Sequence, residues 1–309
     1  MTQVAQWTRF ETQFTSSTDY GNPVQDARLE VDFASPSGMK HTVWGFWDGD
    51  RTWRVRFSPD ELGDWSFRSR CSREADSGLS GQAGRFRCVA YKGENPLYRH
   101  GAIQLSEDRR YLRHADGTPH FWLSDTAWNG AVLSDDQGWE TYLQDRVAKG
   151  FTAVQFVATH WFVAATDADG NKAYTGAEKI AINPIFYQRL DRKLDALNQH
   201  GLVAGTVMLW AVDSGNPEVR SLNPGTSLPD DQLIVLAQYI VARYGAHHVI
   251  WILGGDGHYE RDKAERWKRI GRAAFACHQP LEPTGQKTPT FQIVSACQPD
   301  STVSARLSL

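Results

Sequence analysis

Asp256 stands in a pattern of residues that suits carboxylate chemistry. It follows an unbroken apolar run, Val249 to Leu253, and two glycines, Gly254 and Gly255. Such a run is typical of a strand that is buried on both faces of a parallel sheet, and the carboxyl end of that strand faces the ligand in α/β folds. The glycines let the backbone turn sharply without Cβ clashes. Asp256 is therefore a candidate catalytic residue; the alternative is that it caps a helix beginning near Glu260.

Polar and aromatic side chains also follow three earlier apolar segments. These segments are FWLSDTAW at 121–128, FTAVQFVAT at 151–159 and LVAGTVMLW at 202–210. If all four are parallel strands, their carboxyl ends meet at one edge of the sheet. Carboxylates, imidazoles and indoles that converge there suit a carbohydrate site, because carboxylates do acid/base work and rings stack on sugar faces. The predicted substrate-binding residues are Asp125, Thr126, Trp128, His160, Trp161, Trp210 and His258.

Each of these residues also has a structural alternative. Asp125 could hold a loop by accepting backbone N–H groups, and His160 could be a hydrogen-bonded loop histidine. Trp161 and Trp210 could simply close the top of a core. The joint placement of these residues favours the functional interpretation.

Metal and nucleotide chemistry find little support in the sequence. A metal-dependent hydrolase could use His160, Asp256 and His258, but no pair of them has the i, i+4 helical spacing of a persuasive ligand set. No glycine-rich phosphate loop follows the first of the four strands. We therefore expect no metal and no cofactor.

The elements that must position these residues alternate between strand and helix. Helices are expected at 135–149, 184–200, 230–244 and 260–277 from apolar residues at helical spacing. This alternation predicts an α/β fold with a (β/α)8 barrel of the TIM type, rather than a doubly wound sheet.

The end of the chain departs from the barrel pattern. Short strands are expected at 279–285 and 291–296, after which neither helix nor strand is indicated. Because a complete barrel needs about 250 residues, we expect an incomplete barrel that ends after about strand five or six.

The first 92 residues have a different character. Six β-rich segments, separated by turn signals, predict a small antiparallel β-sandwich over residues 1–92, which leaves 93–309 for the barrel. Aromatic and apolar residues alternate in this region, either as an inward-facing core stripe or as a sugar-binding platform: Trp53, Val55, Phe57, Trp65 and Phe67.

Composition narrows the class of protein further. The 309 residues are 41 % apolar and 22 % charged with a net charge of −3, which gives no electrostatic case for nucleic acid or an anionic membrane. The twelve Trp residues are many for one chain and suit sugar stacking, although a core also uses them.

The cysteines and the N-terminal residues indicate in which cellular compartment the protein is expected. Cys71 and Cys88 could face each other across a hairpin, but free buried thiols are expected because the N-terminus lacks an export signal. No apolar run is long enough to span a membrane. A soluble cytoplasmic protein is the resulting expectation.

Three strands resemble those of a known family. FWLSDTAW, FTAVQFVATHW and VIWILGGD are similar to the apiosidase-like catalytic domain of bacterial glycoside hydrolases, also called the DUF4038 family. The segment GFWDGDRTWRVRFSPDELGDWSF resembles DUF5060, a β-sandwich domain commonly found in front of it. The resemblance implies a (β/α)8 barrel that hydrolyses glycosidic bonds of a plant or bacterial polysaccharide with two carboxylates and retention of configuration.

The resemblance also implies a role for Asp256. The aspartate that closes the GGD motif would be the general acid/base, with a pKa raised by apolar surroundings. The partner nucleophile of such barrels lies near the seventh strand, where this chain has no match. Asp125 or Asp213 could replace it, but no sequence feature places either of them at the separation that a retaining pair needs.

The lack of a matched nucleophile keeps a second class of function open. The chain could be a non-catalytic carbohydrate-binding protein or an inactive glycosidase fragment. The open sheet edges of an incomplete barrel predict self-association, and the sequence does not define the oligomeric state.

Overall fold

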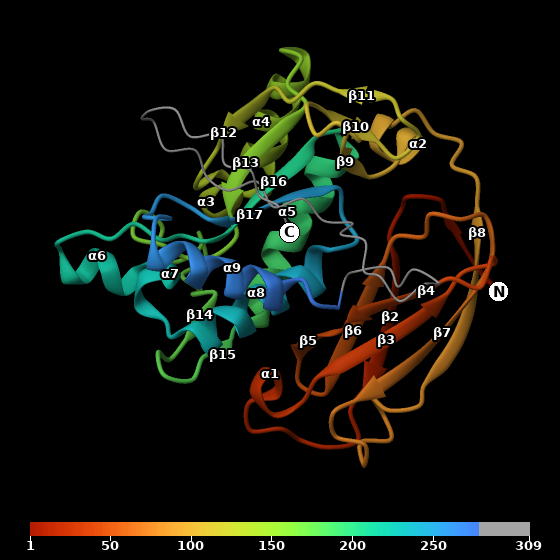
Figure 1. The fold of residues 1–309 in the computed structure, drawn as a ribbon, viewed down its shortest axis with the longest axis horizontal. Helices are drawn as coiled ribbons and strands as arrows, with labels where there is room; N and C mark the ends of the chain where they lie inside the picture. The colour runs from red at the N-terminus through yellow and green to blue at the C-terminus, as the bar shows by residue number, and fades with distance from the viewer. Residues whose placement is uncertain (278–309) are drawn as a thin grey trace.

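The computed structural model describes residues 1–277 of the chain, which form a mixed α/β protein (Figure 1). Two β-sheets occupy the N-terminal part, and a parallel sheet with helices occupies the rest. No helix within the described residues is long and apolar enough to cross a membrane.

The N-terminal part is a sandwich of two sheets. One sheet has the order β1-β8-β7-β3-β4 and the other the order β2-β6-β5. Their strands are β1 (Thr2–Ala5), β2 (Phe10–Thr15), β3 (Leu29–Ala34), β4 (Lys40–Trp44), β5 (Phe46–Gly49), β6 (Thr52–Phe57), β7 (Gly63–Cys71) and β8 (Ala83–Val89). The expected antiparallel pairing is confirmed for every pair except β1 with β8, which is parallel and was not predicted.

Aromatic rings from both sheets fill the space between them. Phe33 of β3 stacks on Phe57 of β6 with ring centroids 4.2 Å apart, and Trp65 is fully buried. Trp53 and Val55 are buried in the same cluster, against which Phe67 packs. The alternating aromatic stripe is therefore core, not a sugar platform.

The two sandwich cysteines are free and buried. Cys71 lies opposite Leu29 of β3, whereas Cys88 lies opposite Gly63 at the far end of β7. They do not face each other, so the expectation of free thiols is confirmed.

The second part is built on a four-stranded parallel sheet. Its order is β12-β13-β16-β17, which is the order of the strands along the chain. The strands are β12 (Ser124–Thr126), β13 (Ala153–Val157), β16 (Val203–Leu209) and β17 (Val249–Gly254). Sequential order agrees with barrel-type winding, because a doubly wound sheet reverses direction after its first strands. Within residues 1–277 the sheet is not closed into a barrel, and the strands expected at 279–285 and 291–296 lie outside the described residues.

Helices follow the strands as expected. All four predicted helices are present, with boundaries shifted by at most three residues: α4 (Asp136–Ala148), α5 (Pro184–Gln199), α8 (Asp230–Tyr244) and α9 (Asp262–Ala274). Short elements that were not predicted are α1 (Pro23–Asp26), α2 (Pro96–His100), α3 (Gly130–Leu133), β14 (Tyr174–Thr175), β15 (Ala181–Ile182), α6 (Pro217–Leu222) and α7 (Pro224–Ser227). Every residue of β16 is buried, as expected for a strand covered on both faces.

A small antiparallel sheet covers the amino ends of the parallel strands. It consists of β9 (Ile103–Leu105), β10 (Leu112–His114) and β11 (Pro119–His120), and β9 and β10 form an antiparallel hairpin. Ile103 and Leu112 pack against Ala153, Val203 and Ile250, which lie at or next to the first residue of their strands. Because this end is closed, the carboxyl ends of the strands remain for a ligand.

Buried ion pairs join the sandwich to the helices. Asp191 of α5 pairs with Arg56 of β6 and with Arg243 of α8, both at 2.7 Å, and Arg243 also reaches Asp48 of β5 at 2.9 Å. Burial opposes ionisation of Asp191, but the two guanidinium groups outweigh it and hold the pKa of its carboxyl well below its usual range. We call Asp48, Arg56, Asp191 and Arg243 the junction cluster.

Replacing Asp191 by Ala should lower the free energy of unfolding by about 3–5 kcal/mol, because two buried guanidinium groups lose a shared partner. Urea unfolding monitored by tryptophan fluorescence measures this. The matched control is Asp64→Ala, whose pair with Arg87 at 3.7 Å joins two side chains that are both 58 % exposed. That control should cost less than about 1 kcal/mol, and equal losses for both variants would contradict a structural role for the junction cluster.

Candidate active site

Three tryptophans from different strands meet beyond the carboxyl ends of the parallel sheet. The ring of Trp210, after β16, lies 4.2 Å from that of Trp161, after β13, and 5.6 Å from that of Trp128, after β12. Trp161 and Trp210 are buried, and Trp128 is partly exposed. The strand ends thus bring together the indoles that the sequence singled out, and we call these three residues the tryptophan cluster.

The three rings of the cluster differ in burial, and this difference indicates different roles. Trp161 and Trp210 belong to the hydrophobic core, which agrees with the alternative that they close its top. Within residues 1–277, their indole nitrogens are buried without a hydrogen-bond partner. Trp128 retains exposed surface and is the ring of this cluster best placed to stack on a sugar.

The GGD motif lies against this cluster. A Cβ on Gly255 would lie 2.2 Å from Cε3 of Trp210, and one on Gly254 would lie 2.5 Å from the hydroxyl of Tyr259. The chain bends at Gly255, as expected, but neither glycine has a positive φ, so left-handed backbone is not what requires them. Their reason is close approach, because rings pack directly on the backbone that carries Asp256.

Asp256 itself is exposed at the end of β17. Its carboxylate accepts no hydrogen bond from any described residue, and helix α9 begins only at Asp262 with Arg261 as its N-cap. The helix-capping alternative for Asp256 is therefore wrong. Within residues 1–277, apolar side chains do not enclose this carboxylate, and the nearby His258 is exposed as well.

Tyr259 belongs to this site although sequence reasoning did not select it. Its hydroxyl donates to the carbonyl oxygen of Gly255. Burial and the negative charge of Asp256 both raise the pKa of Tyr259, so the phenol keeps its proton beside the carboxylate. The sequence feature that could have identified Tyr259 is its position, three residues after Asp256.

Asp125 is directed toward helix α4. Its Oδ2 accepts hydrogen bonds from the Tyr142 hydroxyl at 2.9 Å and from Arg146 at 2.5 Å, and its Oδ1 accepts from the backbone N–H of Thr126 at 2.8 Å. Burial acts to raise the pKa of Asp125, but these hydrogen bonds outweigh it and lower the pKa. Asp125 is therefore held in place, as the structural alternative has it, but mainly by side chains of α4 and not by backbone N–H groups. Thr126 is exposed.

His160 is buried, with 4 % of its surface exposed. Its Nδ1 accepts the backbone N–H of Ala173 at 3.2 Å, so the neutral ring carries its proton on Nε2. Burial, with the nearby charge of Lys172, lowers the pKa of His160 to about 4. At neutral pH it can donate a hydrogen bond but carries no charge.

Asp213, the other carboxylate considered as a nucleophile, lies in the loop after β16. It pairs with Arg220 of α6 at 3.2 Å and with Lys263 of α9 at 3.7 Å. Both Asp213 and Asp125 are therefore engaged with cations. Among residues 1–277, no group of three or more His, Cys, Asp or Glu side chains is arranged to hold a metal ion.

Comparison with known proteins identifies the family. The model of the apiosidase-like catalytic domain matches residues 106–297, and the domain of unknown function DUF5060 matches residues 3–72. The chain belongs to the apiosidase-like family. No curated protein sequence matches it at a significant level.

Solved structures agree on the fold of this apiosidase-like chain. A protein of Bacteroides vulgatus ATCC 8482, named as a proposed glycoside hydrolase, is 23 % identical with a TM-score of 0.71 over 90 % of this chain and 54 % of its own. A glycoside hydrolase family 5 protein from the same strain is 21 % identical with a TM-score of 0.50 over 60 % of this chain and 40 % of its own. The chain thus spans about half the length of the first of these structures.

Replacing Gly255 by Ala should displace the Trp210 ring and destabilise the protein by about 1–3 kcal/mol. Near-ultraviolet circular dichroism and thermal unfolding report both effects. Gly215→Ala is the matched control, because a Cβ there meets no atom of residues 1–277 within 4 Å. If the two variants behave alike, the packing of Trp210 on Gly255 does not fix the Asp256 backbone.

The imidazole of His160 should titrate near pH 4 when followed by NMR. Because the folded pKa is below the value of about 6.5 in unfolded chains, the unfolded state binds more protons between these values. Stability should therefore fall as pH drops from about 6.5 to 4. His160→Gln should remove that share of the pH dependence, and a titration midpoint near 6.5 would contradict the buried, neutral ring.

Proposed function

We propose that this apiosidase-like chain is a glycoside hydrolase that cleaves O-glycosidic bonds of a plant or bacterial polysaccharide. Its active site is formed at the carboxyl ends of β12, β13, β16 and β17. The four strands belong to a (β/α)8-type barrel, a proposal that their sequential order and the likeness to the family 5 structure support. The division into residues 1–92 and 93–309 stays a prediction.

Asp256 acts as the general acid/base of a retaining mechanism. It protonates the leaving oxygen while a second carboxylate, to which no residue of this chain is assigned, takes up the glycosyl group, and it then activates the water that releases the sugar. The observation that carries this proposal is its placement: it is an exposed carboxylate that accepts no hydrogen bond within residues 1–277, next to backbone on which Trp210 packs. Asp125 and Asp213, in contrast, are held by cations.

Three of the remaining predicted residues contact the sugar, and three others support the site. Trp128 supplies a partly exposed ring for stacking, and Thr126 and His258 supply exposed polar groups near the strand ends. His160 stays neutral and positions the loop through Ala173. Trp161 and Trp210 pack on each other, and Trp210 also contacts the Trp128 ring and so holds it in place.

A specific observation favours one alternative, a non-catalytic carbohydrate-binding protein. A retaining mechanism needs a second carboxylate about 5–5.5 Å from the first. Asp125 and Asp213 are occupied with Arg146 and Arg220, so neither is a free nucleophile. Under this alternative the aromatic site binds sugar without turnover.

Replacing Asp256 by Asn should lower kcat about 10²–10⁴-fold, because an amide cannot transfer the proton. Sugar affinity measured by calorimetry should be retained. The assay uses chromogenic glycosides and pectin fragments, with and without a chelator.

Asp262→Asn is the matched control, since Asp262 is an exposed carboxylate of the first turn of α9. It should leave turnover unchanged. Binding without turnover by the unmodified chain would favour the non-catalytic alternative, and loss of turnover with chelator would favour a metal enzyme.

A further inference from the structure

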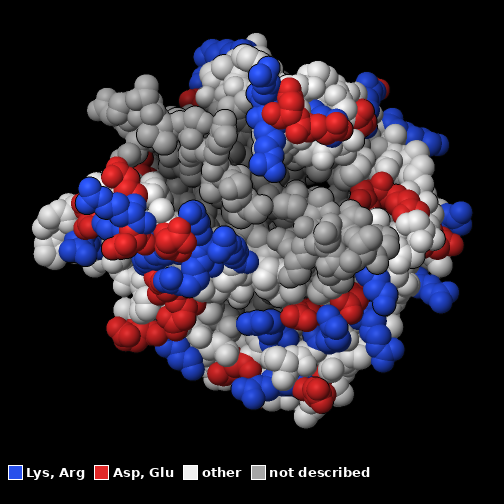
Figure 2. All heavy atoms as spheres, in the orientation of Figure 1, with Lys and Arg blue, Asp and Glu red and all other residues white. Residues whose placement is uncertain are grey.

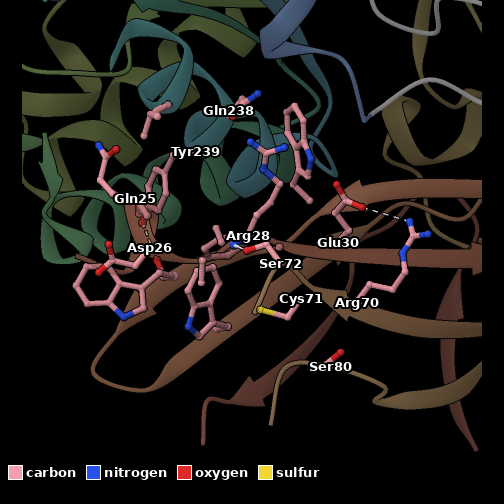
Figure 3. Close-up of a pocket in the computed structure, with 18 of the residues that line it drawn as sticks. Gln25, Asp26, Arg28, Glu30, Arg70, Cys71, Ser72, Ser80, Gln238 and Tyr239 are labelled. Atoms are coloured by element: carbon pink, nitrogen blue, oxygen red, sulfur yellow. Dashed lines mark hydrogen bonds and ion pairs between the residues drawn. The ribbon is translucent and has the colours of Figure 1, made fainter. Parts of the chain in front are cut away.

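A cavity of about 900 Å³ lies between the sandwich and helix α8, away from the strand-end site (Figure 3). Its walls come from α1, β3 to β7 and the loop after β7 on one side, and from Val235, Gln238 and Tyr239 of α8 on the other. The volume is within the range of small-molecule sites.

The two walls of the cavity are held in place. The hydroxyl of Tyr239 donates to the carbonyl oxygen of Trp47 at 3.0 Å, directly across the junction. Arg243, one turn further along α8, belongs to the junction cluster. A ligand would therefore meet a preformed cavity and would lose little affinity to ordering of the protein.

Arg28 is less engaged than Arg70, the other cationic residue of this cavity, which pairs with Glu30 and Asp32. The side chain of Arg28 is exposed, and its guanidinium group makes no hydrogen bond or ion pair with any residue of 1–277. Figure 3 shows it pointing from the sandwich toward Gln238 of α8. A guanidinium group offers five donors and no acceptor, so a ligand beside Arg28 must present acceptor oxygens.

Carboxylates in the same lining impose the opposite requirement. Asp26 uses one oxygen to accept the backbone N–H of Asn22 at 2.8 Å, and Glu30 pairs with Arg70 at 3.3 Å. Their remaining lone pairs need donors. The ligand must therefore both accept and donate hydrogen bonds at close spacing, as vicinal sugar hydroxyls do.

The balance of charges selects a neutral ligand. The lining has two cationic residues, Arg28 and Arg70, and three acidic residues, Asp26, Glu30 and Glu74. A polyanion would meet a net negative lining. Trp47 adds a partly exposed indole to the same cavity, and such a ring can stack on a sugar face.

The geometry points to a second glycan-binding site in this cavity, which takes a neutral oligosaccharide segment. That the ligand is a glycan rests on the proposed function, whereas the need for a neutral, polyhydroxylated ligand rests on the lining itself. Arg28 donates to ring or hydroxyl oxygens, Asp26 accepts from hydroxyls, and Trp47 stacks on the sugar.

The test uses the full chain and isothermal titration with cello-, xylo- and galacto-oligosaccharides at millimolar concentration. Oligogalacturonate is the anionic comparison. Arg28→Ala should weaken binding of a neutral probe roughly tenfold, because it removes charge-assisted hydrogen bonds. Arg85→Ala, an exposed arginine of β8 outside the cavity, is the matched control and should bind like the unmodified chain.

Hydrogen exchange locates the bound sugar. Protection of residues 26–30 and 70–72 on addition of the neutral probe is expected. No binding of any neutral probe, equal affinity of the Arg28 and Arg85 variants, tighter binding of oligogalacturonate, or protection confined to 255–259 would overturn the proposal.

The outcome is separable from that of the proposed function. Arg28→Ala should hydrolyse a small chromogenic glycoside at the unmodified rate, and Asp256→Asn should retain binding in the cavity. Binding in the cavity without hydrolysis by the unmodified chain defeats only the proposed function, and hydrolysis without binding in the cavity defeats only the second site.

Discussion

The parallel pairing of β13, β16 and β17 is the constraint on which the rest of the structure depends. Each strand is hydrogen-bonded in register to the strand that precedes it in the chain, and β12 joins the same sheet. Parallel pairing in chain order sends every connecting helix back along the sheet and leaves all carboxyl ends on one edge. With the amino ends covered by β9 to β11, the tryptophan cluster and Asp256 necessarily share the open end.

Buried ion pairs fix the sandwich to helices α5 and α8, which pack beside that sheet. The junction cluster buries two arginines and two aspartates between β5, β6, α5 and α8. Buried ions of this kind stabilise only when all partners are present, so they fix one geometry between the units. Elsewhere, basic and acidic side chains are interspersed on the face seen in Figure 2. Because the junction cluster fixes the sandwich against α8, the cavity between them has rigid sides.

Local sequence patterns predicted most of the fold because their causes are local. The apolar runs gave β13, β16 and β17, and the helical stripes gave α4, α5, α8 and α9. In contrast, β1 pairs with β8 across most of the sandwich sequence, a contact for which no short-range signal exists.

The site was predicted less completely for the same reason. Sequence placed Asp125 at a strand end but could not show that Tyr142 and Arg146, more than ten residues later, turn it toward α4. The glycines before Asp256 were identified, yet their reason is the Trp210 ring, which arrives from another strand. Tertiary contacts also decide which charges pair, as Arg70 does with Glu30, and which have no partner within residues 1–277, as at Arg28.

Chemical rescue of Asp256→Ala with azide, using an aryl glycoside with a good leaving group, tests the central claim most directly. Such a substrate transfers its glycosyl group to the nucleophilic carboxylate without acid assistance, and azide then replaces the water that Asp256 would activate. We expect the variant to release a glycosyl azide of retained configuration, at a rate that rises with azide concentration. Undiminished hydrolysis by the variant without azide, or no turnover by either chain, would contradict the assignment of Asp256 as the general acid/base.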